Sequence, residues 1–162
     1  MIEIRPATPA DYDTIGELTV DVYVDGGFVS DTSTYVNRLR DTATRAEHAE
    51  VVVAVAGDEI VGSLTIAEPG TPFADVAEPG ELEFRMLAVA PTARGKGVGS
   101  ALVKHVLDEA YDRGLARVVI STEADMVDAR RIYDRNDFVP APQRDWEPMP
   151  GVALTVLVRE FV

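Results

Sequence analysis

LAVAPTARGKGVGS, residues 87–100, is the segment from which the architecture of this chain is inferred. Its hydrophobic beginning is typical of a strand end, and its glycine-rich end is typical of a turn that opens a helix. Glycines allow the backbone to approach a ligand closely, and the first amides of a helix have no partner inside the helix. Together with the positive end of the helix dipole, these amides predict a binding site for phosphate groups.

The charges around this segment favour the same interpretation. Residues 84–107 contain no Asp or Glu, although 28 acids in 162 residues would place about four there. The same window holds Arg85, Arg94, Lys96 and Lys104. A buried strand followed by an amphipathic helix would also exclude acids. Of these two interpretations, we favour a polyphosphate ligand.

Two familiar phosphate motifs do not match. A nucleotide P-loop requires Lys and then a hydroxyl residue after its last glycine, but Gly99 is followed by Ser100 and Ala101. A dinucleotide fingerprint requires a third glycine, but Ser100 stands at that position. It also requires an acidic residue at the end of the following strand, and none occurs at the expected distance. Both nucleotide classes are therefore excluded.

Hydrophobic periodicity and turn residues predict the elements around this segment. Strands are expected at 2–6, 51–56, 60–66, 81–89, 117–122, 138–139 and 154–158, and helices at 8–22, 34–47, 97–113 and 127–135. Residues 69–80 are expected to form an exposed loop. The strand, helix and strand between 81 and 122 imply a parallel crossover.

The composition is that of one globular domain spanning residues 1–162. With no cysteine, disulfides, thiolate metal sites and a cysteine-bound acyl group are excluded. His48 and His105 lack metal-ligand spacing, so no metal is expected. The formal charge of −13 argues against nucleic acid. Short apolar runs and an N-terminus without a secretory pattern predict a cytoplasmic protein that does not enter a membrane.

The motif [QR]-x-x-G-x-[GA] is matched by RGKGVG, residues 94–99. It follows a strand end of the form Leu-x-Val-x-Pro and is trailed by IYDRNDF, residues 132–138. In this order the chain resembles the GNAT superfamily of N-acetyltransferases over nearly its whole length. The resemblance implies a mixed α/β (GNAT acyl-CoA N-acyltransferase) fold, with a central twisted sheet of six to seven strands flanked by about four helices on both faces.

The resemblance also implies acetyl-CoA as the acetyl donor, with no metal. The backbone of Leu87 and Val89 would pair with the pantetheine arm. The pyrophosphate would be held by main-chain amides of the turn, namely Arg94, Gly95, Lys96, Gly97, Val98, Gly99 and Ser100.

An irregularity in the strand at 81–89 agrees with such a site. Leu82, Phe84 and Met86 set one apolar phase, and Leu87 and Val89 set the opposite one. A slip in alternation near residues 86–87 predicts a β-bulge. In the family, a bulge there splays two parallel strands and opens the thioester cleft.

A protonated amine must lose a proton before it can attack, so a general base or a water chain is needed. Glu83 is the first candidate, because it resembles the position of the catalytic glutamate in some family members, and Glu123 is the second. Glu81, Glu83 and Arg85 share one strand face, which is also consistent with a solvated face carrying an ion pair.

Two further roles follow from the resemblance. Tyr133 resembles the family tyrosine that returns a proton to the departing thiolate, although an aromatic core residue is the other interpretation. A strand amide freed by the bulge, at Leu87 or Ala88, would donate to the oxyanion. Two residues depart from the family pattern: Met126 stands where asparagine is frequent, and Asp137 stands in place of glycine.

The acceptor is expected to be a small-molecule amine. Its site is expected among residues 23–35, 69–80 and 143–150, where Phe28 or Trp146 would wall a pocket. Acetylation of a protein N-terminus or lysine is an alternative, and a non-catalytic acyl-CoA-binding regulatory module is another. The sequence is compatible with a homodimer.

Overall fold

The computed structural model describes residues 1–161. Its strands are β1 (Ile2–Pro6), β2 (Glu50–Ala56), β3 (Glu59–Ala67), β4 (Glu81–Val89), β5 (Arg117–Thr122), β6 (Val139–Pro140), β7 (Trp146–Met149) and β8 (Val152–Glu160). Its α-helices are α1 (Tyr12–Asp25), α2 (Tyr35–Arg40), α3 (Thr42–His48), α4 (Val98–Asp112) and α5 (Val127–Arg135). The expected mixed α/β fold is confirmed, with eight strands and five α-helices in this range.

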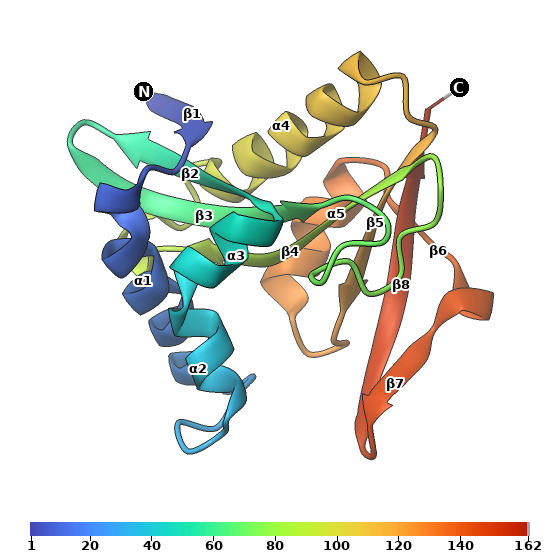
Figure 1. Cartoon of the computed structure of the whole chain (residues 1–162), viewed down its shortest axis with the longest axis horizontal. Coiled ribbons are helices and arrows are strands. Elements are labelled where there is room, and N and C mark those ends of the chain that lie inside the picture. The colour runs from blue at the N-terminus through green and yellow to red at the C-terminus, as the bar shows by residue number, and fades with distance from the viewer. Residues whose placement is uncertain (162) are drawn as a thin grey trace.

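The strands form one sheet in the order β1-β2-β3-β4-β5-β8-β6, and β7 pairs with β8. Figure 1 shows β1, β2 and β3 on one side of the molecule and the β7–β8 hairpin on the other. β4 and β5 are parallel and are joined through α4, as predicted for the crossover. The other strand pairings in residues 1–161 are antiparallel.

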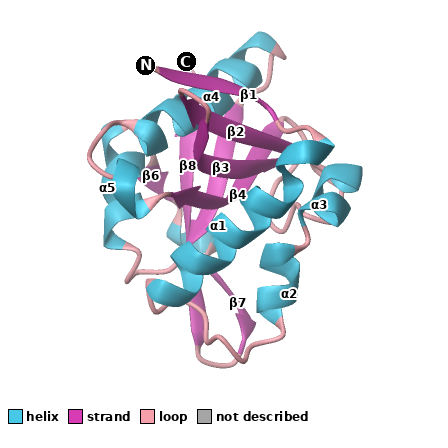
Figure 2. Cartoon of the chain, turned by 90° about the vertical axis from the view of Figure 1, so that its left-hand side faces the viewer, coloured by secondary structure: helices cyan, strands magenta, loops and turns pink. Residues whose placement is uncertain are grey.

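Helices cover both faces of the sheet. Alternation in β2 divides its side chains: Val52 and Ala54 face the core under α4, whereas Val51, Val53 and Val55 pack with Ile15 of α1. Figure 2 shows α1 lying across β2, β3 and β4. Within residues 1–161, no helix is long and apolar enough to cross a bilayer.

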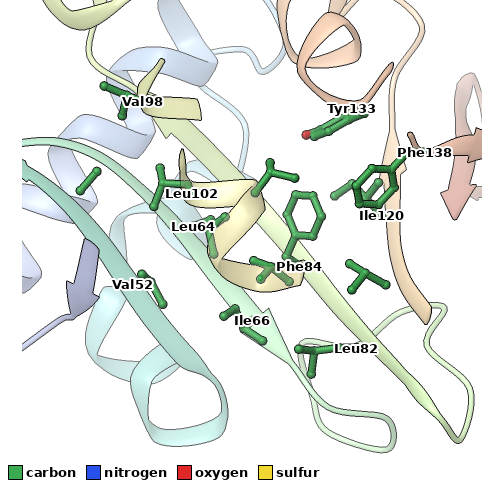
Figure 3. Close-up of a cluster of buried hydrophobic side chains, with 14 of the residues drawn as sticks. Val52, Leu64, Ile66, Leu82, Phe84, Val98, Leu102, Ile120, Tyr133 and Phe138 are labelled. Carbon is green, nitrogen blue, oxygen red and sulfur yellow. The ribbon is translucent and has the colours of Figure 1, made fainter. Parts of the chain in front are cut away.

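The main core is centred on Phe84 of β4. Its ring meets Tyr133 edge-on at 5.7 Å and Phe138 at 6.1 Å between centroids. Figure 3 shows these rings from α5 and the chain after it on one side of Phe84, with Leu102 of α4 on the other. Edge-to-face contacts of this kind add about 0.5–1.5 kcal/mol per pair beyond area burial. α5 is therefore fixed against β4.

The predicted β-bulge is confirmed in β4. Ser63 pairs with Ala88 and Thr65 with Arg85, so β4 uses one residue more than β3. The expected phase of Met86 is wrong: this residue has a φ of 57° and packs with α1 and α2, on the opposite face from Phe84. The slip therefore begins at Arg85, and Leu87 returns to the α4 face.

The bulge marks the point where β4 and β5 separate. Their parallel pairing runs from Glu81 opposite Arg117 to Glu83 opposite Val119 and goes no further. β5 continues to Thr122 along β8 instead, while β4 continues to Val89 along β3. The expected splaying of two parallel strands is confirmed.

Two elements differ from the expected boundaries. The helix expected at 34–47 is two helices, because Asp41 leaves helical geometry and its side chain accepts a hydrogen bond of 3.1 Å from the amide of Thr44 at the start of α3. Buried Arg45 donates to the last carbonyls of α2, at Arg38 and Leu39. The segment 143–150, for which no strand was expected, contains β7.

The face carrying Glu81 and Glu83 is not solvated, in contrast to one interpretation of the sequence. The loop at 69–80 covers it, and the two glutamates are 0% and 1% exposed. Arg144 binds Glu81 through two hydrogen bonds of 2.8 and 2.9 Å, and Arg117 adds one of 2.8 Å. Arg144 also donates to the carbonyl of Val76 at 2.7 Å, which ties the loop to this cluster.

The Glu81 cluster predicts a pH-dependent loss of stability in Glu81→Gln. Burial favours the neutral acid, but hydrogen bonds from Arg144 and Arg117 outweigh it and leave the pKa of Glu81 below its ordinary value. A lowered pKa stabilises the fold above the unfolded-state pKa, and this contribution is lost as pH falls through the folded-state pKa. We expect Glu81→Gln to cost about 3 kcal/mol in the free energy of unfolding by urea at neutral pH. The cost should shrink below about pH 4.

The matched control is Glu78→Gln in the same loop. Glu78 is 65% exposed and its carboxylate is 3.9 Å from Arg144, so its replacement should change stability by less than about 1 kcal/mol. Equal losses in the free energy of unfolding for Glu81→Gln and Glu78→Gln would contradict the assigned role of Glu81.

Candidate functional site

The turn before α4 is built on two glycines in the left-handed region. Gly95 has a φ of 78° and Gly97 a φ of 81°. A Cβ at either position would meet no atom within 4 Å, so the backbone conformation alone favours glycine there. Gly97 is also the residue that caps the N-terminus of α4. The chain therefore passes from the turn into α4 with the amides of the turn facing outward.

Five amides of this turn have no acceptor among residues 1–161: Gly95, Gly97, Val98, Gly99 and Ser100. The amides of Arg94 and Lys96 make long bonds of 3.4 Å to the carbonyls of Pro91 and Ala93. Unpaired amides at a helix N-terminus attract an anion through hydrogen bonds and the helix dipole. This arrangement fits a diphosphate.

Two other glycines let the start of α4 pack closely against its neighbours. A Cβ on Gly62 of β3 would lie 2.7 Å from Cγ1 of Val98. A Cβ on Gly99 would lie 2.4 Å from Cδ1 of Ile132 in α5. Both distances are too short for side-chain contact, so these glycines bring the turn against the sheet on one side and α5 on the other.

A cavity of about 880 Å³ opens beside the turn. Its lining comes from four regions: the end of α1 (Val22, Tyr23, Gly26, Phe28), the end of β4 (Leu87, Val89), the turn (Ala93, Arg94, Gly95, Gly97, Val98, Gly99, Ser100) and the α5 region (Asp125, Met126, Val127, Asp128, Ala129, Arg131, Ile132, Tyr133, Arg135). The volume lies in the range of small-molecule sites.

Most of the cofactor residues expected from the sequence line this cavity. Leu87 and Val89 border it where β4 has left β5, and the turn borders it from Arg94 to Ser100 except at Lys96. Ala88 and Lys96 are not part of the lining. The side chains of Arg94 and Lys96 are exposed and make no ion pair within the described chain.

Tyr133 lines the same cavity although it is only 3% exposed. Phe84 and Phe138 hold its ring from two sides. Its hydroxyl has no hydrogen-bond partner in residues 1–161 and is not among the fully enclosed atoms, so it opens onto the cavity. Burial raises the pKa of this phenol well above its ordinary value. The group is therefore protonated at neutral pH.

The two candidate bases lie outside the cavity lining. Oε1 of Glu83 accepts hydrogen bonds of 2.9 and 3.0 Å from the amides of Val76 and Ala77 in the loop that covers it. Burial raises the pKa of Glu83 despite these bonds. Glu123 follows the end of β5 and is half-buried, and its pKa is raised by burial and then by the neighbouring carboxylate of Asp125, which does line the cavity.

Of the two aromatic residues expected at the acceptor site, Phe28 lines the cavity and Trp146 does not. Trp146 packs against Val119, Val156 and Val158, and its indole donates to Ser121 at 3.0 Å. It is therefore an anchor of the β7 hairpin.

The two departures from the family pattern have structural consequences. Met126 lines the cavity, and its sulfur accepts from the hydroxyl of Thr122 at 3.8 Å. Asp137 adopts a φ of 66°, the left-handed geometry that the usual glycine would provide.

Sequence reasoning missed several residues of the cavity. Val22 lines it from α1, on the opposite face of the sheet from α4, beside Tyr23 and Gly26 of the expected acceptor segment 23–35. Arg131 and Arg135 line it from α5. The only signal for Val22 was the glycine pair that follows α1, because helical spacing alone does not reveal which turn of a helix reaches a bulge in another strand.

Comparisons with known proteins agree with this geometry. A family model described as "Acetyltransferase (GNAT) family" matches residues 16–138. A mycothiol acetyltransferase of Beutenbergia cavernae is 38% identical over 58 residues, which are 36% of this chain and 20% of that protein. The match thus spans about a fifth of the length of that curated relative.

Solved structures show the same fold over the whole chain. An acetyltransferase of the GNAT family from Staphylococcus aureus Mu50 superposes with a TM-score of 0.79 at 12% identity, covering 99% of both chains. The PaiA N-acetyltransferase from Thermoplasma acidophilum, in complex with coenzyme A, superposes with a TM-score of 0.73 at 15% identity, also covering 99% of both chains. At these identities the likeness concerns the fold.

Proposed function

Since this chain belongs to the acetyltransferase (GNAT) family and is an acyltransferase, we propose that it transfers the acetyl group of acetyl-CoA to a primary amine of a small molecule. The observation that carries the proposal is the set of five unpaired amides at the mouth of α4. Acetyl-CoA contains a diphosphate that matches these donors, and the related PaiA fold was determined with coenzyme A.

The residues of the turn and of β4 would hold the donor. Amides from Gly95 to Ser100 would bind its diphosphate, with Arg94 and Lys96 adding positive charge. Leu87 and Val89 lie where β4 no longer pairs with β5, so their backbone is available to the pantetheine arm. Acetyl-CoA supplies an activated thioester, from which the acetyl group passes to the amine nitrogen.

Tyr133 would act as the general acid. Its hydroxyl opens onto the cavity, and burial raises its pKa, so the phenol is protonated at neutral pH and available to donate to the departing thiolate. A strand amide at Leu87 or Ala88, beside the bulge, would donate to the developing oxyanion. This role requires only the backbone.

We place Glu123 ahead of Glu83 as the general base. The amides of Val76 and Ala77 occupy one oxygen of Glu83 and hold it under the loop, whereas Glu123 stands next to a residue of the cavity lining. Burial raises the pKa of both glutamates, and Asp125 adds to this for Glu123, so either carboxylate would be a stronger base than usual and position decides between them. Glu83 stays the second candidate.

A small acceptor is favoured by the dimensions of the cavity, which are those of a site for a metabolite-sized ligand. Two other functions make different predictions. A protein acetyltransferase would act on peptides but not on free amines. A non-catalytic module would bind acetyl-CoA without releasing thiol. Thiol release from acetyl-CoA across a panel of free amines and peptides tests all three.

The amide turn predicts that Gly97→Val weakens binding of coenzyme A. A β-branched residue at a φ of 81° is strained, and relief of the strain would turn amides away from the diphosphate. We expect the dissociation constant from titration calorimetry to rise about tenfold or more, which corresponds to 1–2 kcal/mol of strain.

Gly114→Val is the matched control, because Gly114 has a φ of 73° and open space around its Cβ but lies beyond the far end of α4. It should lower stability while leaving the affinity for coenzyme A unchanged. Lack of coenzyme A uptake by the wild type would overturn the assignment of the turn.

The acid role predicts that Tyr133→Phe lowers kcat by about 10²-fold. The phenyl ring keeps the packing against Phe84 and Phe138, so stability and coenzyme A affinity should change little. Tyr111→Phe is the control, since Tyr111 is 67% exposed. An unchanged kcat in Tyr133→Phe would show that the thiolate takes its proton elsewhere.

The base role predicts different pH profiles for two isosteric variants. In the wild type, kcat should fall as pH drops through the raised pKa of Glu123, because the protonated acid cannot accept a proton. Glu123→Gln should lower kcat by about 10²-fold and remove that acidic limb. Glu83→Gln should mainly change thermal stability. The reverse pattern would return the role to Glu83.

A further inference from the structure

The cavity joins two chemically different regions on opposite faces of the sheet. The face of α4 and α5 supplies the unpaired amides and the basic residues Arg94, Arg131 and Arg135. The face of α1 supplies Val22, Tyr23, Gly26 and Phe28, among which there is no basic side chain. Only the first region offers donors and positive charge for phosphates. The second region is therefore suited to the apolar or uncharged part of another ligand.

The α1 side is a preformed aromatic wall, here called the aromatic end and defined as Tyr23, Gly26 and Phe28. The rings of Tyr23 and Phe28 meet edge-on with centroids 6.4 Å apart. The carbonyl of Tyr23 accepts hydrogen bonds from the amides of Phe28 and Val29, at 3.0 and 3.1 Å, which folds the chain back after α1. This turn fixes Phe28 beside Tyr23.

Gly26 provides the room for this arrangement. A Cβ at this position would lie 2.6 Å from Cε2 of Phe28 and 2.8 Å from the carbonyl oxygen of Val22. Any larger residue would push the Phe28 ring from its place. The aromatic end is thus built by local backbone geometry and does not require a ligand to form.

The hydroxyl of Tyr23 gives this wall one polar group. It has no hydrogen-bond partner in residues 1–161 and is not among the fully enclosed atoms, so it opens onto the cavity that Tyr23 lines. Tyr23 packs with Met86 on one face of β4, and Tyr133 packs with Phe84 on the other. Two phenols therefore reach the same cavity from opposite faces of the bulged strand.

One carboxylate of the lining has no cationic partner. Asp125 makes no ion pair within the described chain, whereas Asp128 lies 3.7 Å from Arg131. Asp125 instead neighbours Glu123, and two adjacent carboxylates favour a cationic ligand over an anionic one. Aromatic surface and a phenol on the α1 side, with Asp125 on the α5 side of the same cavity, match an ammonium group on a flat apolar body.

Building on the proposed acetyl transfer, we propose that the aromatic end is the acceptor subsite and selects primary amines carried on a planar, apolar group. The ring of the acceptor packs on Phe28, and its amine meets the Tyr23 hydroxyl. Phe28 is then the specificity-determining residue and Tyr23 a contact common to all acceptors.

The test compares 2-phenylethylamine with ethylamine as acceptors, using thiol release and titration calorimetry of coenzyme A. Wild-type kcat/KM should favour 2-phenylethylamine by about tenfold or more. Phe28→Ala should lower kcat/KM for 2-phenylethylamine by about tenfold, mainly through KM, and change that for ethylamine less than about twofold. Phe28→Leu, which keeps apolar volume, should show a smaller loss. Tyr23→Phe should lower kcat/KM for both amines about fivefold, because each loses one hydrogen bond.

Tyr111→Phe is the matched control for the phenol, and thermal melting confirms that each variant is folded. All variants should keep the wild-type affinity for coenzyme A. Equal kcat/KM for the two wild-type reactions, or equal losses for both amines in Phe28→Ala, would overturn the acceptor subsite while leaving acetyl transfer in place. Absence of acetylation with every amine, despite coenzyme A binding, would overturn the proposed function as well.

Discussion

One extra residue in β4 is the constraint on which the rest of the structure depends. Before it, β4 pairs with β5; after it, β4 keeps only β3 as a neighbour, and the edge that faced β5 becomes available. A strand edge that loses its partner inside a protein leaves backbone groups without hydrogen bonds, which is costly unless a ligand pairs with them. The bulge therefore creates both the space for a ligand and a reason to bind one.

The cost of the bulge is met by packing on both faces. Met86 holds a left-handed φ that costs of order 1–3 kcal/mol for a residue other than glycine. Its side chain is buried against Val20, Val36 and Leu39, which offsets this cost. On the other face, the rings around Phe84 fix α5 and with it Tyr133. The same distortion thus places one phenol on each side of the strand.

Much of this architecture was predictable because the relevant signals are local. The glycines at 95–99 and the broken alternation at 82–89 lie within a few residues of the features they cause, and both the helix start and the bulge were found. Long-range contacts left no such signal. Glu81 and Glu83 alternate with apolar residues as on a solvated face. Only distant partners explain their burial, namely Arg144 and Arg117 for Glu81 and the amides of the 69–80 loop for Glu83. Val22, which extends the α1 side of the cavity beyond the expected segment 23–35, was missed for the same reason.

The charge distribution adds a final constraint on how such a site operates. The chain has a formal charge of −13, so its overall field repels a polyphosphate at long range. At physiological ionic strength that field decays over about 8 Å, and within this distance the turn presents unpaired amides together with Arg94 and Lys96, in a stretch of sequence without acids. Binding of an anionic donor then depends on contact with the turn, whereas a cationic acceptor is attracted from farther away. Under the proposed function, the two substrates would therefore be handled by different physical means, the donor by directed hydrogen bonds and the acceptor by the general field and the aromatic surface of α1.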